Sequence, residues 1–144
     1  MRVTCIRTSI FAIAFIVLNC VAQALSLECS DVVNGNLVVP SSVQSIASYA
    51  FSNCGALKTI EFASPSQLRV IEYNAFQSSG LTAISIPASV RVIEESAFSG
   101  SGSLAGVTYE CSSSGDLLPI DVGLNAFMGT PYTTNGRAVP GRSC

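Results

Sequence analysis

Apolar residues recur along residues 36–127 in a two-part pattern. The first part has the form L-x-x-I-x-I/F, and it occurs in LKTIEF (57–62), LTAISI (81–86) and LAGVTY (104–109), with a partial copy in NLVVP (36–40). Its last two apolar positions are two residues apart, which places both side chains on one side of a β-strand. The pattern therefore predicts a series of short strands, each presenting one apolar face to a core.

The second part has the form V/L-x-x-I-x-x-x-A-F and predicts a return wall opposite the strands. It reads VQSIASYAF (43–51), LRVIEYNAF (68–76) and VRVIEESAF (90–98), and a degraded copy reads PIDVGLNAF (119–127). We expect two ladders of inward-facing side chains along this wall, one aliphatic and one aromatic. They consist of Ile46, Ile71, Ile93 and Val122, and of Phe51, Phe76, Phe98 and Phe127.

Successive copies are 22 to 29 residues apart, and self-similarity at this period is the signature of a solenoid. One coil cannot bury its apolar face alone, so stability must come from stacking of neighbouring coils. The fold class predicted is a repeat solenoid of about three and a half coils. It is expected to be mainly β, with strands of successive coils forming a short parallel sheet and with irregular or short helical returns.

The stretch LTAISIPASVRVIEESAFSGSGS (81–103) resembles one unit of the BspA-like, treponemal-type leucine-rich repeat, L-x-x-I-x-I-P-x-S-V-x-x-I-x-x-x-A-F-x-x-C-x-x. The resemblance covers about residues 36–127. It implies a right-handed leucine-rich-repeat solenoid that is usually secreted or displayed on a surface, for which adhesion and protein binding are the usual proposals. The chain departs from the family pattern where Ser79 and Gly102 replace the repeat cysteine, and where two residues are inserted around Pro65. Members are typically much longer arrays.

The first residues have the pattern of a secretory signal peptide over residues 1–24. Arg2 and Arg7 form a basic region, residues 10–18 are an unbroken apolar run, and Ala22-Gln23-Ala24 is a small-x-small cleavage site. An uncleaved membrane anchor is the first alternative, but the run is shorter than the ~18–20 apolar residues that a spanning helix needs. A lipoprotein acylated at Cys20 is the second, and the preceding Asn19 does not fit a lipobox.

After cleavage, the chain is expected to comprise an N-terminal cap at 25–35, the repeats at 36–127 and a C-terminal cap or tail at 128–144. This mature chain has five basic and nine acidic residues, a net charge of −4. The basic residues are dispersed, so no footprint for nucleic acid or anionic lipid is present. We expect a secreted, extracellular or cell-surface monomer that does not insert into the membrane after signal cleavage.

Four cysteines remain in the mature chain, which predicts two disulfides in a small secreted domain. Cys29 and Cys54 are 25 residues apart, one repeat length, and stacked strands about 4.8 Å apart suit a disulfide. Cys29–Cys54 is therefore expected to close the N-terminal cap. Cys111–Cys144 then follows by elimination and would hold the tail over the last coil.

The residue inventory argues against catalysis. The chain contains no histidine, so it has no Ser-His-Asp triad, Cys-His pair or histidine-ligated metal, and we expect no catalytic residues, metal or cofactor. The glycine-rich GSGSLA (100–105) fits a dinucleotide-loop pattern but is interpreted as the polar turn before the next strand. The adjacent Glu94 and Glu95 are interpreted as part of a solvated convex face.

The remaining candidate for function is the exposed side of the strands, which is the usual contact face of leucine-rich repeats. Its predicted partner-binding residues are Val38, Thr59, Glu61, Ala83, Ser85, Gly106 and Thr108. They are small, neutral or weakly acidic, and they include none of the Trp, Tyr or Arg side chains favoured at strong hot spots. A non-catalytic module for binding or adhesion to an extracellular protein or glycan is the leading hypothesis. A structural, self-assembling solenoid without a specific ligand is the alternative.

Overall fold

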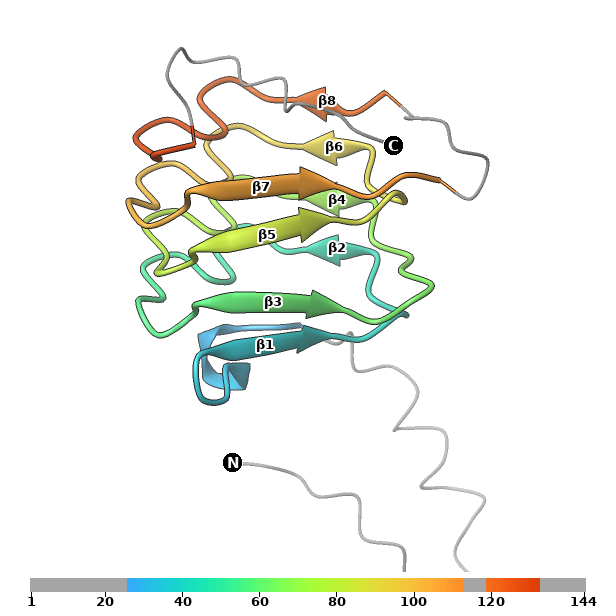
Figure 1. Cartoon of the computed structure of the whole chain (residues 1–144), viewed down its shortest axis with the longest axis horizontal. Coiled ribbons are helices and arrows are strands. Elements are labelled where there is room, and N and C mark those ends of the chain that lie inside the picture. The colour runs from blue at the N-terminus through green and yellow to red at the C-terminus, as the bar shows by residue number, and fades with distance from the viewer. Residues whose placement is uncertain (1–25, 113–118, 133–144) are drawn as a thin grey trace, which may run out of the picture.

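The computed structural model describes residues 26–112 and 119–132, and it is a solenoid with two walls of parallel strands (Figure 1). A short 3-10 helix, η1 (Cys29–Asp31), precedes the first coil and is the only helix in this part of the chain. The broad wall comprises β1 (Asn36–Val39), β3 (Thr59–Phe62), β5 (Ala83–Ile86) and β7 (Gly106–Tyr109). The narrow wall comprises β2 (Ser45–Ile46), β4 (Val70–Ile71), β6 (Val92–Ile93) and β8 (Asp121–Val122). The predicted solenoid is confirmed, and its returns contain turns and two-residue strands.

The narrow wall is one continuous parallel sheet in the order β2-β4-β6-β8. Ile46, Ile71 and Ile93 stack in register and are buried, as the repeat predicts. Val122 continues the register but is 39% exposed, so its prediction as a buried residue is wrong. The reason is its place in β8, because no further coil of the described chain stacks beyond that strand.

The four phenylalanines of the Ala-Phe pairs form a stacked ladder beside the narrow wall. The ring centroids of Phe51, Phe76, Phe98 and Phe127 are 5.3, 5.1 and 5.0 Å apart in succession, with interplanar angles of 7° or less. Tyr132 meets the last ring edge to face at 5.4 Å. All four phenylalanines are at most 3% exposed, which confirms the predicted aromatic ladder.

Each phenylalanine lies between two residues of left-handed backbone, two positions before it and two positions after it. The preceding set is Tyr49, Asn74, Ser96 and Asn125, and the following set is Asn53, Ser78, Gly100 and Gly129. The two left-handed residues fold the chain into a tight corner that aims each phenylalanine inward. Backbone bonds join the corners, such as Phe76 N–H to the Ala97 carbonyl at 2.7 Å. Asn and Gly tolerate this conformation best, which accounts for several of the Asn and Gly residues that flank the Ala-Phe pairs.

The broad wall is divided, and the predicted continuous sheet is wrong at one point. β1 pairs with β3 and β5 pairs with β7, but β3 and β5 form no ladder. In the two paired sets, Ala63 N–H donates to the Val39 carbonyl and Glu110 N–H donates to the Ile86 carbonyl. The equivalent donor between β3 and β5 would be residue 87, which is a proline and has no N–H. The two residues inserted around Pro65 also lengthen the turn that follows β3.

One buried column runs through all coils three residues after each phenylalanine. Cys54 occupies it first, and its bond to Cys29, with Cα atoms 5.7 Å apart, confirms the predicted N-terminal disulfide. Ser79 and Ser101 follow, with their hydroxyl oxygens 3.1 Å apart, and Ser101 also donates to the Phe76 carbonyl. Ser101, rather than the predicted Gly102, thus takes the place of the repeat cysteine. Gly102 is exposed in the turn one residue later.

The ends of the chain are described only in part. The predicted signal peptide at 1–24 lies outside the described residues, as do residues 133–144 of the predicted C-terminal cap. Cys111 is disulfide-bonded, whereas Cys144, its predicted partner, is also outside the described residues. Within residues 26–112 and 119–132, no helical segment has the length and hydropathy needed to cross a bilayer.

Candidate functional site

The outward side of the broad wall brings all the predicted partner-binding residues onto one surface. Register pairs Thr59 with Asn36 and Gly106 with Ala83 in a first column. The second column pairs Val38 with Glu61 and Ser85 with Thr108. Alternation along each strand turns these side chains away from the core, which receives Leu37, Ile84 and Val107 instead.

Most of this surface is accessible to a partner. Thr59, Glu61, Ala83 and Thr108 are exposed, Val38 is 57% exposed, and Ser85 and Gly106 are half-buried. The half-buried pair lies on β5 and β7, where the strands are hydrogen-bonded and their small side chains leave the backbone close to the surface. A Cβ on Gly106 would lie 3.3 Å from the Ala83 Cβ, so this position accepts a larger side chain only if its neighbour shifts.

Hydrogen bonds join side chains along the face. Thr59 Oγ1 donates to Asn36 Oδ1 at 2.9 Å, and Ser85 Oγ donates to Glu110 Oε1 at 3.4 Å. Thr82 Oγ1 donates to the Lys58 carbonyl at 3.1 Å. These bonds add Asn36, Lys58, Thr82 and Glu110 to the residues that the sequence assigned to the face. Repeat register contains the signal for them, since Asn36 lies in the first column opposite Thr59 and the other three each directly precede or follow a strand.

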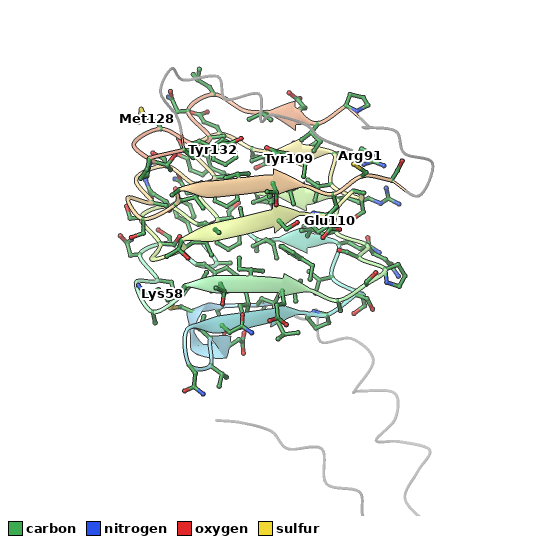
Figure 2. All side chains as sticks on the ribbon, in the orientation of Figure 1. Lys58, Arg91, Tyr109, Glu110, Met128 and Tyr132 are labelled. Atoms are coloured by element: carbon green, nitrogen blue, oxygen red, sulfur yellow. A yellow bond between two sulfur atoms is a disulfide. The ribbon has the colours of Figure 1, made fainter. Side chains whose placement is uncertain are left out.

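The charges on the broad wall are sparse. Figure 2 shows Lys58 at the start of β3 and Glu110 close to the far ends of β5 and β7. Glu61 adds one exposed carboxylate on β3. The face is therefore a mainly neutral, hydroxyl-bearing surface with a positive group at one edge and negative groups in its middle and at the other edge.

The narrow wall differs from its predicted role as a plain solvated face. Glu72 Oε2 accepts bonds from the Ser48 N–H at 3.0 Å and from the Ser48 hydroxyl at 3.1 Å. Glu94 Oε2 accepts the Tyr73 N–H at 2.8 Å in the same way. Both carboxylates are half-buried and join their coil to the preceding one. The expectation of a solvated face is therefore wrong for Glu94, whereas Glu95 is exposed as expected.

Two turn features have clear structural roles. GSGSLA (100–105) is the turn between the phenylalanine corner and β7 and opens no helix, as its interpretation predicts. Tyr132 caps the phenylalanine ladder, and burial raises the pKa of its phenol above the ordinary value. In the described part of the chain, no three His, Cys, Asp or Glu side chains form a group that could hold a metal ion.

Comparison with known proteins gives a family and one structural neighbour. The family model described as the BspA type leucine rich repeat region matches residues 29–132 in six copies. A solved structure titled as the crystal structure of the pneumococcal vaccine antigen PcpA is similar with a TM-score of 0.56 and 32% sequence identity. The match covers 67% of this chain but only 28% of that one. No curated protein matches.

Proposed function

Because this chain belongs to the BspA-type leucine-rich-repeat family, we propose that it is a secreted or surface-exposed module that binds an extracellular protein or glycan without catalysis. The outward face of the broad wall is the contact surface. Support comes from the family, from the likeness to part of a vaccine antigen, and from the Cys29–Cys54 disulfide, which suits an oxidising compartment.

The observation that carries this proposal is the contrast between conserved packing and varied surface within the repeat. Inward positions of the strands keep large apolar side chains from coil to coil, whereas the outward columns change from Asn to Thr, Ala and Gly, and from Val to Glu, Ser and Thr. Packing against the core requires apolar side chains at the inward positions, but it does not restrict the residues of the outward columns. Specificity therefore belongs to the outward columns, where each coil offers a different side chain.

Arginine substitutions on the face test this function. In a pull-down from extracellular extract, Ala83→Arg and Thr108→Arg should each remove partner capture while leaving the melting temperature unchanged, because both sites are exposed. Gln44→Arg is the matched control, since it places on the narrow wall the arginine that Arg69 and Arg91 supply in the next two coils. Normal capture by both face variants would disprove the proposed contact surface.

A second candidate function is end-to-end assembly, the structural alternative of the sequence analysis. One observation favours it, because Leu124 and Met128 in the last coil are 71% and 53% exposed. An assembling solenoid would grow in size with concentration, whereas a capped binding module would remain monomeric. Light scattering over a dilution series distinguishes the two, and Leu124→Ser should abolish any growth that it reveals.

A further inference from the structure

Tyr49 occupies a backbone position that suits it poorly. Its φ is 63°, in the left-handed region, where the equivalent residues of the later coils are Asn74, Ser96 and Asn125. Asparagine tolerates this conformation because its short polar side chain can bond locally, whereas a bulky side chain there is an outlier. The backbone of the first coil therefore gives no reason for a tyrosine at this corner.

Burial gives no reason either. The Tyr49 side chain is 54% exposed, and its neighbour Tyr73 in the next coil is 39% exposed. The two rings meet edge to face, with centroids 5.5 Å apart and an interplanar angle of 81°. Such a contact stabilises the pair modestly, but both rings still present large areas to solvent. Strained positions with exposed aromatic side chains are typical of functional surfaces.

Carboxylates are held beside this aromatic pair. Glu72 bonds to Ser48, the residue before Tyr49, and Glu94 bonds to the N–H of Tyr73 itself. All of these bonds use Oε2, so Oε1 of each glutamate makes no bond to any described residue. One carboxylate is thus held at the residue before Tyr49 and the other at the backbone of Tyr73, each by bonds to the preceding coil.

We propose that Tyr49, Tyr73, Glu72 and Glu94 form a second binding surface, which takes an arginine or lysine side chain of a protein partner. A cation over a tyrosine ring is attracted by the ring quadrupole, and a nearby carboxylate adds to this attraction. The described residues also carry eight acidic and three basic side chains, which favours a basic partner over a neutral glycan. This surface is on the narrow wall and does not depend on the broad-wall function.

A peptide titration tests the surface directly. The probes are a blocked glycine-serine peptide with two arginines, the same peptide with glutamines, and a neutral oligosaccharide. The readout is the ring resonances of the disulfide-bonded chain in NMR spectra, assigned with Tyr49→Phe and Tyr73→Phe. The arginine peptide should shift the Tyr49 and Tyr73 resonances in a saturable way, and raising the salt concentration should weaken its binding. Tyr109 and Tyr132 should not respond.

Variants separate binding from folding. Tyr49→Asn places at this corner the residue that the second and last coils use, so the chain should melt at or above its native temperature while losing the response to arginine. Glu72→Gln combined with Glu94→Gln keeps the hydrogen-bond acceptors and should weaken binding about two- to fivefold, as expected for the loss of exposed ion pairs. Asp121→Asn in β8 removes an exposed carboxylate in the last coil, away from the tyrosine pair, and should leave binding unchanged.

Three results would overturn the proposal. The glutamine peptide could shift the resonances as strongly as the arginine peptide, the oligosaccharide could shift them when the arginine peptide does not, or neither peptide could shift them. A lower melting temperature for Tyr49→Asn would also count against it, because the contribution of the ring to stability would then explain why a tyrosine occupies this position. None of these results bears on the arginine variants of the broad wall, so the two surfaces are tested separately.

Discussion

The two walls of this solenoid hold the coils together in different ways. The narrow wall has only two residues in each strand, yet its sheet is continuous through four coils and the phenylalanine ladder runs beside it. The broad wall has four residues in each strand, yet its sheet is broken between β3 and β5. The longer strands therefore do not make the more continuous wall.

This contrast indicates that side-chain stacking, rather than strand length, defines the axis of the solenoid. A proline and a two-residue insertion are tolerated on the broad wall because the buried ladders of the other wall keep the coils in register. The same division leaves the broad wall free to vary its outward residues. The following predictions test this division of roles, in order of expected effect.

Phe76→Ala should destabilise the fold most. The ring lies between Phe51 and Phe98 at 5.3 and 5.1 Å and is fully buried, so its loss leaves a cavity in the middle of the ladder. We expect a loss of about 3–5 kcal/mol in the free energy of unfolding, measured with urea. Val38→Ala on the exposed side of the broad wall should change it by less than about 0.5 kcal/mol. Equal losses in the free energy of unfolding would show that both walls contribute equally to stability.

Replacing Cys29 and Cys54 together with alanine should have the second largest effect. The bond closes a separation of 25 residues, and removal of such a crosslink costs about 3 kcal/mol. The loss should appear in urea unfolding of the oxidised protein. A reducing agent should cause at least this loss in the native chain, because it also breaks the disulfide of Cys111. A variant as stable as the native chain would mean that stacking alone holds the first coil.

Ser101→Ala should cost about 1–3 kcal/mol, because it leaves the Ser79 hydroxyl without its buried partner and removes one of the two acceptors of the Ser79 N–H. Ser79→Cys combined with Ser101→Cys should instead form a disulfide, since these residues follow Cys54 in the buried column and their hydroxyl oxygens are 3.1 Å apart. Thiol titration of the unfolded protein detects that bond. Free thiols at both positions would show that neighbouring residues of the column are not placed as a disulfide requires.

Pro87→Ala, combined with deletion of Ser64 and Pro65, should join the two halves of the broad wall. The new N–H at position 87 can then donate to the Phe62 carbonyl, as Ala63 and Glu110 do in their coils. Stability should change by less than about 1 kcal/mol, because the new bond is offset by the lost rigidity of proline. Amide hydrogen exchange should show protection at residue 87. Pro40→Ala, which has no equivalent strand before it, should gain none.

Several features of the fold could be predicted from the sequence because the same residue types recur at equivalent positions of the repeat. The buried isoleucines and phenylalanines, the period, the Cys29–Cys54 bond and the outward columns all follow from register, since stacked coils bring equivalent positions together. Recurrence is less informative at the last coil, where Val122 fits the repeat but no further coil of the described residues covers it. It also led to Gly102 in place of Ser101, an error of one position within a glycine- and serine-rich turn.

The sequence alone thus determined the solenoid, its two ladders and the N-terminal closure, because these depend on repeated spacing and on the burial of apolar side chains. Only the tertiary structure decided where the ladder of the broad wall breaks, that Glu72 and Glu94 bind the backbone of the preceding coil, and that Tyr49 and Tyr73 meet at an exposed corner. These features depend on hydrogen-bond donors and backbone angles between coils. Such contacts join residues about 24 positions apart, and no local pattern along the chain encodes them.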